Sequence, residues 1–203
     1  RYNEIMKDHP ETIWDDIQKI LGEYQWCPPL GPYSPYRPCA LFETMFMRVC
    51  PYTVKGIWYY QGESDTCRPH IYYRLFTSLI SKWRECWHDD KLPFLFVQLP
   101  MYGEENSQTD TKEWAYIREA QNKTFDTIKN TGMAVILDQG DFSNIHPPVK
   151  KYVGIRLADQ SLELVYGKHT DSYGPMYSGY EIHKNIIKIF FFKWRNIKSF
   201  WRT

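Results

Sequence analysis

Hydrophobic residues along the chain alternate between short continuous runs and longer segments in which they recur every three or four positions. The continuous runs are typical of strands buried on both faces of a parallel sheet, and they occupy residues 54–60, 92–100 and 132–140. The periodic segments are typical of helices with one apolar face, and they occupy residues 70–87, 112–130 and 147–167. Strand and helix thus alternate three times, which predicts an α/β fold with a three-layer, flavodoxin-like parallel sheet.

The last of these helices carries boundary signals of its own. Pro147 and Pro148 suit its first turn, where the missing proline N–H has no partner to lose, and Gly167 suits its end. Beyond that glycine, residues 174–192 are rich in Tyr, Ile and Phe and predict one or two strands of a β element, with "HKN" as a hairpin turn. The basic and aromatic residues 193–203 are expected to form a frayed end.

The region before the first strand is less regular. Apolar spacing predicts an amphipathic helix over residues 11–21, and five prolines with one glycine in residues 27–38 predict a loop or extended linker. Residues 40–52 are helix-forming and are expected to end near Pro51.

Composition narrows the class of protein without identifying it. A chain of 203 residues with 43% hydrophobic content can bury one good-sized core, and a net charge of +1 does not indicate a nucleic-acid partner. No apolar run reaches the ~18 residues of a membrane span. The five cysteines include no C-x-x-C pair or histidine at zinc-ligand spacing, so we expect no metal site and interpret them mostly as small core residues. An aromatic content of 17% fits an aromatic-rich core or a surface that stacks on sugars.

Candidate chemistry lies where the three predicted strands end, because an open parallel sheet binds ligands at the carboxyl ends of its strands. The polar side chains expected there are Gln61, Glu63, Ser64, Asp138, Asp141, Asn144 and His146. His146 is the strongest single candidate, because it precedes a proline-started helix and follows acidic and amide side chains closely. A histidine oriented by a neighbouring acid can act as the general base that activates a hydroxyl.

Ser64 raises the question of a nucleophile. A nucleophile elbow follows the order G-x-S-x-G, whereas the stretch here reads Gly-Glu-Ser-Asp with no second glycine. We therefore interpret Ser64, like Asp65, as an N-cap of the following helix. Gln61 and the backbone of Gly62 suit another role, since an amide N–H₂ and a main-chain N–H at a strand end can donate to a developing oxyanion.

Three stretches together resemble a known family: "VKGIWYYQGESD", "WRECWHDDKLPFLFVQLPMY" and "NIHPPVKKYVGIRLA". They are similar to the sialate O-acetylesterases, which are carbohydrate esterases of the SGNH hydrolase superfamily. The resemblance covers roughly residues 37–192 and implies removal of O-acetyl groups from sialic acids or other acetylated sugars by a serine nucleophile, with no metal or cofactor. It also implies that the protein is exported.

The resemblance implies a role for each matching residue. Gln61 corresponds to the oxyanion-hole donor, Glu63 to a site residue that orders the pocket, and His146 to the base. The serine of Q-G-E-S is not the nucleophile in this family, which agrees with the cap interpretation of Ser64. We assign Gly62 and Asn144 to the substrate-binding part of the site.

Two positions depart from the family pattern. The family nucleophile lies in a G-Q-S-N-like motif far upstream of Q-G-E, but Ser34 is the only serine among residues 1–60 and no Gly-Gln precedes it. The superfamily often has an aspartate three residues before the histidine, where Ser143 stands here. Asp141 could replace that acid, or Asn144 could orient the ring without a charge.

These observations lead to a domain division and two hypotheses. We expect an N-terminal helix and linker in residues 1–36, a partial esterase domain in 37–167 and a partial β-rich segment in 168–203. The leading hypothesis is that this is the C-terminal part of an esterase, inactive alone because the nucleophile lies outside the 203 residues. The alternative is a non-catalytic carbohydrate-binding or interaction module. The sequence does not indicate an oligomeric state.

Overall fold

The computed structural model of the chain describes residues 2–9, 16, 19–20, 37–50, 52–103, 112–141 and 144–192. The chain divides into two compact units, Arg1–Thr53 and Val54–Thr203. The three-part division expected from the sequence stays a prediction.

The first unit contains short helical segments. Helix α1 spans Tyr2–Asp8 and was not predicted from the apolar spacing. Of the helix predicted over residues 11–21, residues 16, 19 and 20 are described and are helical, while the rest of it and most of the proline-rich linker lie outside the described residues. The helical segment predicted over residues 40–52 is confirmed as a π-helical turn, Phe42–Phe46, continued by α3, Met47–Val49.

The cysteines differ from the prediction that they mostly fill the core. Cys39 and Cys67 are exposed and Cys86 is half-buried, while Cys50 is buried. Cys50 lies at the end of a helical segment and donates its thiol to the Phe46 carbonyl at 3.5 Å. The two exposed cysteines occupy turns that precede helices, so the core prediction is wrong for them because their sequence position carries no burial signal.

Three parallel strands form the sheet of the second unit in the order β1–β2–β3. Their bounds are Ile57–Tyr59 for β1, Phe94–Gln98 for β2 and Thr131–Val135 for β3. Phe94 of the central strand lies opposite Ile57 on one side and Thr131 on the other. The three predicted strands and their parallel arrangement are confirmed.

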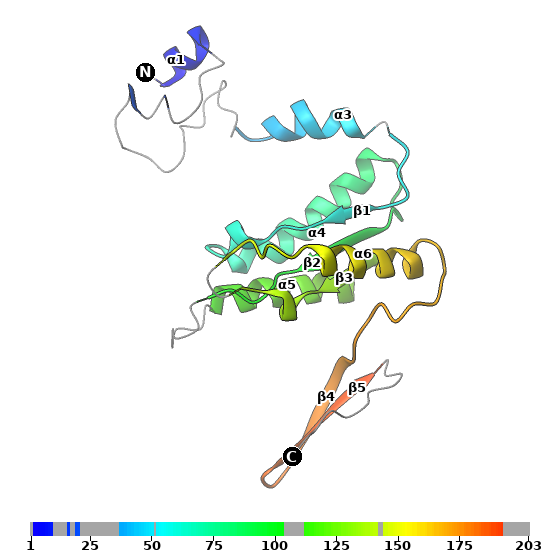
Figure 1. Cartoon of the computed structure of the whole chain (residues 1–203). Helices are drawn as coiled ribbons and strands as arrows, with labels where there is room; N and C mark the ends of the chain where they lie inside the picture. Colours follow the sequence, from blue (N-terminus) through cyan, green and yellow to red (C-terminus); the bar gives the residue numbers. More distant parts are fainter. Residues whose placement is uncertain are drawn as a thin grey trace. The chain divides into compact units, whose positions relative to one another are not determined.

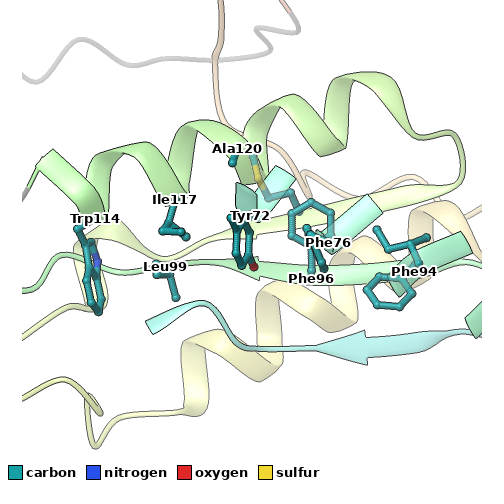
Figure 2. Close-up of a cluster of buried hydrophobic side chains, with 10 residues drawn as sticks. Tyr72, Phe76, Phe94, Phe96, Leu99, Trp114, Ile117 and Ala120 are labelled. Atoms are coloured by element: carbon teal, nitrogen blue, oxygen red, sulfur yellow. The ribbon is translucent and has the colours of Figure 1, made fainter. Parts of the chain in front are cut away.

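Helices cover both faces of this sheet and make three layers (Figure 1). Helices α4, Pro69–Cys86, and α5, Lys112–Thr127, pack on one face, and α6, Lys151–Leu164, packs on the other. Because side chains alternate along a strand, the two faces of β2 belong to different clusters of buried side chains. Phe94 and Phe96 lie in the first cluster, with residues of α4 and α5, and Leu95 and Val97 lie in the second cluster, with residues of α6. Figure 2 shows the first cluster, in which Phe76 of α4 meets Phe96 edge-to-face at 5.0 Å between centroids. The predicted α/β class is confirmed.

Helix α6 begins later than predicted. Its first residue is Lys151, and Gly154 donates its N–H to the Lys150 carbonyl at 3.1 Å. Pro147 and Pro148 therefore belong to the preceding loop, and their placement in the first helical turn is wrong. The helix ends at Leu164, before the predicted end at Gly167, and Gly167 adopts a left-handed φ of 62° in the turn that follows, which a glycine tolerates without strain.

Arg84 stabilises the amino-terminal edge of the sheet, where strands β2 and β3 begin. This residue of α4 is buried, and its guanidinium donates to the carbonyls of Leu92, Lys129 and Asn130 at 2.9–3.0 Å. Those carbonyls lie in the turns that lead into β2 and β3. A single side chain thus ties the entries of two strands to one helix.

The predicted β element is a hairpin. Strands β4, Met176–His183, and β5, Ile186–Phe192, pair antiparallel around a turn at Lys184 and Asn185, which confirms "HKN" as its turn. Most side chains of the hairpin are exposed. Residues 193–203 lie outside the described part. Among the described helices, none has the length and apolar character to cross a membrane.

Candidate active site

Close contacts join the three loops that follow the strands. A Cβ on Gly62, after β1, would lie 3.2 Å from Leu99 at the end of β2. A Cβ on Gly140, after β3, would overlap the backbone of Met101, so the loops after β2 and β3 pack directly on each other. The Lys150 ammonium lies 4.9 Å from the centre of the Tyr60 ring, which connects the segment before α6 to the end of β1. The predicted convergence at the carboxyl edge is therefore present.

The side-chain amide of Gln61 is held at both ends. Tyr59 donates its hydroxyl to Gln61 Oε1 at 3.0 Å, and Gln61 Nε2 donates to Asp65 Oδ2 at 2.6 Å. A carboxylate can only accept, so these partners fix which end of the amide is nitrogen. Burial, aided by the charges of Asp65 and Glu63, raises the pKa of Tyr59 to about 12, and its phenol stays protonated as a donor at neutral pH.

The backbone at Gln61 is held from two helices. Tyr72 of α4 donates its hydroxyl to the Gln61 carbonyl at 3.1 Å, and Gln121 of α5 approaches the same carbonyl at 3.5 Å. Gln121 is buried and also bonds the end of β2, accepting from the Leu99 N–H at 2.9 Å and donating to the Val97 carbonyl at 3.2 Å. The end of β1 is thereby fixed to the end of β2 through one glutamine.

Gly62 needs to be glycine for two reasons. Its φ of 156° lies in a region that side-chain-bearing residues rarely adopt. It is also buried, and a Cβ there would lie 3.2 Å from Ile117 as well as from Leu99. The backbone therefore passes close to the core where the sequence predicts an N–H donor.

The residues after Gly62 form a short 3-10 helix, Glu63–Asp65. The prediction that Ser64 and Asp65 cap the next helix is wrong, because α4 begins at Pro69 with Arg68 as its N-cap residue. The tight 3-10 turn separates them from α4, and Asp65 uses its carboxylate on Gln61 instead. Ser64 is exposed and accepts a weak bond from the Cys67 thiol at its carbonyl.

Glu63 is half-buried on this turn. Its carbonyl accepts the Thr66 hydroxyl at 2.8 Å, which closes the 3-10 turn. Its negative charge contributes, after burial, to raising the pKa of Tyr60 to about 12. The carboxylate of Glu63 therefore lies within electrostatic range of the aromatic residues before the turn.

The loop after β3 carries the predicted base. Asp141 Oδ1 accepts the main-chain N–H of Asn144 at 3.2 Å, and Asn144 Oδ1 accepts the main-chain N–H of His146 at 2.9 Å. Asn144 and His146 are exposed, while the intervening Ile145 packs against the first core cluster. The structure thus brings Asp141, Asn144 and His146 into one hydrogen-bonded loop and connects its centre to the core. Ser143 lies outside the described residues.

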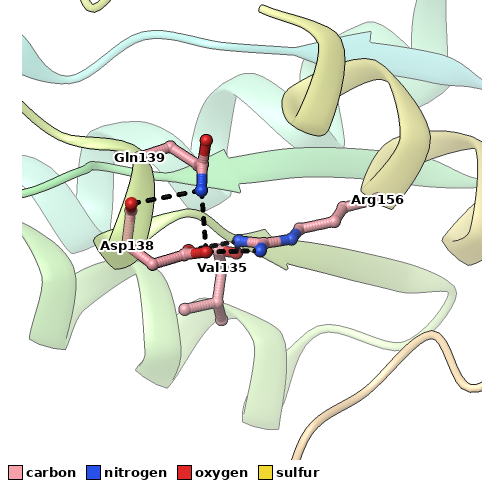
Figure 3. Close-up of polar contacts among 4 residues, drawn as sticks. All are labelled: Val135, Asp138, Gln139 and Arg156. Atoms are coloured by element: carbon pink, nitrogen blue, oxygen red, sulfur yellow. Dashed lines mark hydrogen bonds and ion pairs between the residues drawn. The ribbon is translucent and has the colours of Figure 1, made fainter. Parts of the chain in front are cut away.

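Asp138 has a different partner from the other candidates (Figure 3). Arg156 of α6 binds both its oxygens, at 2.5 and 2.7 Å, and also donates to the Val135 carbonyl at 2.6 Å. This fork, together with a bond from Gln139, holds the pKa of Asp138 well below its ordinary value. The geometry of Asp138 is that of a carboxylate that fastens β3 to α6.

Tyr59, Tyr72 and Gln121 hold Gln61, and the sequence carries no functional signal for any of the three. Tyr59 and Tyr72 resemble ordinary core aromatics, and Gln121 resembles a polar residue on a helix surface. The signal that could have found Gln121 is its place on the apolar face of α5, between Ile117 and Phe125 at helical spacing.

The arrangement offers oriented donors and a candidate base at one edge of the sheet. Among the residues that the structure describes, no three His, Cys, Asp or Glu side chains gather as a metal site would require. An amide N–H at Gln61 and a main-chain N–H at Gly62 are groups that can stabilise a negatively charged oxygen.

Comparisons with known proteins agree on one family. A family model described as carbohydrate esterase, sialic acid-specific acetylesterase matches residues 26–163. The sialate O-acetylesterase of Homo sapiens is 30% identical over 180 residues, covering 79% of this chain and 34% of that protein. The Mus musculus protein of the same name is 31% identical over 159 residues, covering 70% of this chain and 29% of that protein.

A solved structure is also similar. The crystal structure of a carbohydrate acetylesterase from Xanthomonas citri matches with a TM-score of 0.68 and 32% identity, covering 76% of this chain and 36% of that one. The chain therefore spans about a third of the length of the relatives it matches.

Proposed function

Because the chain belongs to the sialic acid-specific acetylesterase family of carbohydrate esterases, we propose that it forms part of an enzyme that hydrolyses O-acetyl esters of sialic acid or other acetylated sugars. The observation that carries the proposal is the Gln61 amide, fixed between Tyr59 and Asp65 at the carboxyl edge of the sheet. Such a fixed donor is what stabilisation of a tetrahedral oxyanion requires.

The proposed chemistry is acyl transfer in two steps. A serine hydroxyl attacks the acetyl carbonyl while His146 takes its proton, and the negative charge on the former carbonyl oxygen is stabilised by Gln61 Nε2–H and the Gly62 N–H. Collapse of the intermediate expels the sugar alkoxide, which receives the proton from His146. Water then attacks the acetyl-serine in the same way and releases acetate.

The nucleophile comes, in this proposal, from sequence outside the 203 residues, which contain no Gly-Gln-Ser-Asn-like motif. Asp141 or Asn144 would orient the His146 ring, and both lie in the loop that carries it, where their carboxylate and amide oxygens bind main-chain N–H groups. Glu63 would order the pocket beside Gln61.

Hydrolysis of p-nitrophenyl acetate tests this proposal. The purified chain is expected to hydrolyse the ester no faster than its His146→Ala variant, because a base without a nucleophile cannot form the acyl-enzyme. The same chain extended through the coding sequence that precedes Arg1 is expected to gain hydrolysis that His146→Ala abolishes.

Each contrary result has a separate meaning. Hydrolysis by the 203-residue chain that depends on His146 would place the nucleophile inside it. An extended protein that contains a Gly-Gln-Ser-Asn-like motif but hydrolyses neither this ester nor an acetylated sugar would contradict the esterase proposal. Binding of acetylated sugar without turnover would then favour a non-catalytic carbohydrate-binding module.

A further inference from the structure

We infer that Asp65 and Tyr59 are positioning residues for Gln61: together they set the orientation of its amide and leave one Nε2–H to serve an anionic oxygen. The inference deepens the proposed function and rests on it for the identity of that oxygen. Asp65 lies four residues after Gln61 and reaches back across the 3-10 turn to Nε2 at 2.6 Å.

The two contacts act on opposite ends of the amide. A glutamine amide can rotate by half a turn, which exchanges its donor and acceptor ends with little change in shape. The flipped amide would point Oε1 at the Asp65 carboxylate and Nε2 at the Tyr59 hydroxyl. Two acceptors would then face each other across a short distance, so the flipped state is disfavoured.

Hydrogen-bond counting leaves one donor over. Nε2 carries two hydrogens, and Asp65 takes one of them. An oxyanion-hole donor must be oriented before the reaction, since reorientation at the transition state would cost part of the stabilisation. The 3-10 turn therefore has a function beyond its backbone geometry, because it returns Asp65 to the amide.

The negative charge of Asp65 works against the stabilisation that the oriented Gln61 amide provides. A carboxylate near a developing oxyanion raises the energy of that oxyanion. A neutral acceptor in its place would keep the orientation and remove this cost. Asparagine offers such an acceptor, so Asp65→Asn separates positioning from charge, while Asp65→Ala removes both.

The test of orientation uses NMR of the ¹⁵N-labelled chain and needs no activity. In Asp65→Ala the Gln61 side-chain amide protons are expected to shift and to exchange with solvent about tenfold faster, as loss of one hydrogen bond implies. Asp65→Asn is expected to restore slow exchange. Tyr59→Phe removes only a hydroxyl from a ring that still packs on Phe76 and Phe94, and it should also accelerate exchange.

A matched control removes the same kind of contact elsewhere. Asp126 accepts the Asn122 side-chain amide at 3.0 Å on the exposed surface of α5. Asp126→Ala should leave the Gln61 signals unchanged. Wild-type exchange at Gln61 in both Asp65→Ala and Tyr59→Phe would overturn the inference, and so would an equal acceleration in Asp126→Ala.

Kinetics of the extended, active protein test the role in catalysis. Asp65→Ala is expected to lower kcat about 100-fold with little change in KM, since the misplaced donor acts at the transition state. Asp65→Asn should restore kcat to the wild-type value or above it, because it keeps the orientation and removes the charge. Wild-type kcat in Asp65→Ala would overturn the inference. If no form of the protein hydrolyses an ester, the proposed function fails, and the exchange measurement alone decides whether Asp65 orients the amide.

Discussion

The turn after β1 and the loop after β3 supply the two halves of the candidate site, and they are fixed by different kinds of contact. Gln61 is held by Tyr59 and Asp65 at its side chain, and by Tyr72 and Gln121 at its carbonyl. The loop that carries His146 is instead held by short-range bonds within itself and by the packing of Ile145.

This difference separates the predicted oxyanion donor from the predicted base. A donor to an oxyanion must be rigid before the reaction begins, and the contacts around Gln61 reach it from two helices, from strand β1 and from the 3-10 turn. The loop after β3 starts at Asp138, whose contact with Arg156 is an exposed ion pair that salt and protons can weaken. The donor side should therefore respond to changes in packing, and the base side to changes in solution conditions.

Gly62→Ala is expected to have the largest effect on stability. The substitution combines an unfavourable φ with a Cβ 3.2 Å from Leu99 and Ile117, and it should lower the free energy of unfolding by about 2–4 kcal/mol. Urea denaturation measures the change. Gly154→Ala, on α6 where a Cβ meets nothing within 4 Å, is the control and should be neutral or slightly stabilising. Equal values for the two variants would show that the turn is not fixed by packing.

Gln121→Leu is expected to have an intermediate effect. The leucine fills a similar volume but leaves the Leu99 N–H and the Val97 carbonyl without their buried partner, which should cost about 1–3 kcal/mol in unfolding free energy. Asn122→Ala, an exposed neighbour on α5, should change stability by less than about 0.5 kcal/mol. If the Gln121→Leu protein proved as stable as the Asn122→Ala protein, the result would contradict the role of Gln121 in fixing the end of β1 to the end of β2.

Asp138→Asn should have the smallest effect and the clearest dependence on pH. Arg156 holds the pKa of Asp138 below its ordinary value of 3.8, so the ionised carboxylate stabilises the fold above that pH and loses the effect as pH falls below it. The side chain of Asp138 is 57% exposed, and solvent screening limits the expected loss at neutral pH to less than about 1 kcal/mol.

Denaturation of wild type and Asp138→Asn at neutral pH, in strong acid and at high salt measures this prediction. The two proteins should converge in acid and approach each other in salt. Glu85→Gln is the control. It removes the charge from an exposed ion pair on α4 in which Lys82 and Glu85 make a single contact, whereas Arg156 binds both oxygens of Asp138. A difference between wild type and Asp138→Asn that persists unchanged in acid would contradict the assignment of the ion pair.

Most of the second unit could be predicted from the sequence because its signals are local. Continuous apolar runs indicated the strands, periodic ones indicated the helices, and Gly167 and "HKN" marked the turn after α6 and the hairpin turn. The start of α6 and the cap of α4 were predicted wrongly. Proline and serine at those places are compatible with a helix start, but tertiary contacts of the loops decided where the helices begin.

For the candidate site, the sequence predicted Gln61 and His146 but not the residues that hold Gln61 in place. Gln61 and His146 follow strands, so their positions at the sheet edge follow from the order of elements. The partners of Gln61 depend on packing between distant segments: Gln121 lies 60 residues away in sequence and reaches the turn only when α5 is packed beside α4. Side-chain pairing of this kind has no periodic signal.

Arg84 gives the amino-terminal edge of the sheet a separate task. Its three carbonyl partners belong to the turns that enter β2 and β3, far along each strand from the residues that would perform chemistry. The amino-terminal edge therefore stabilises the fold, and the candidate site lies at the carboxyl edge. Substitutions around Arg84 should change the melting temperature and leave the contacts of Gln61 intact, whereas substitutions around Gln61 should change both stability and the candidate site. Thermostability can then be altered at the amino-terminal end of β2 and β3 without a change at the candidate site, which lies at the opposite end of these strands.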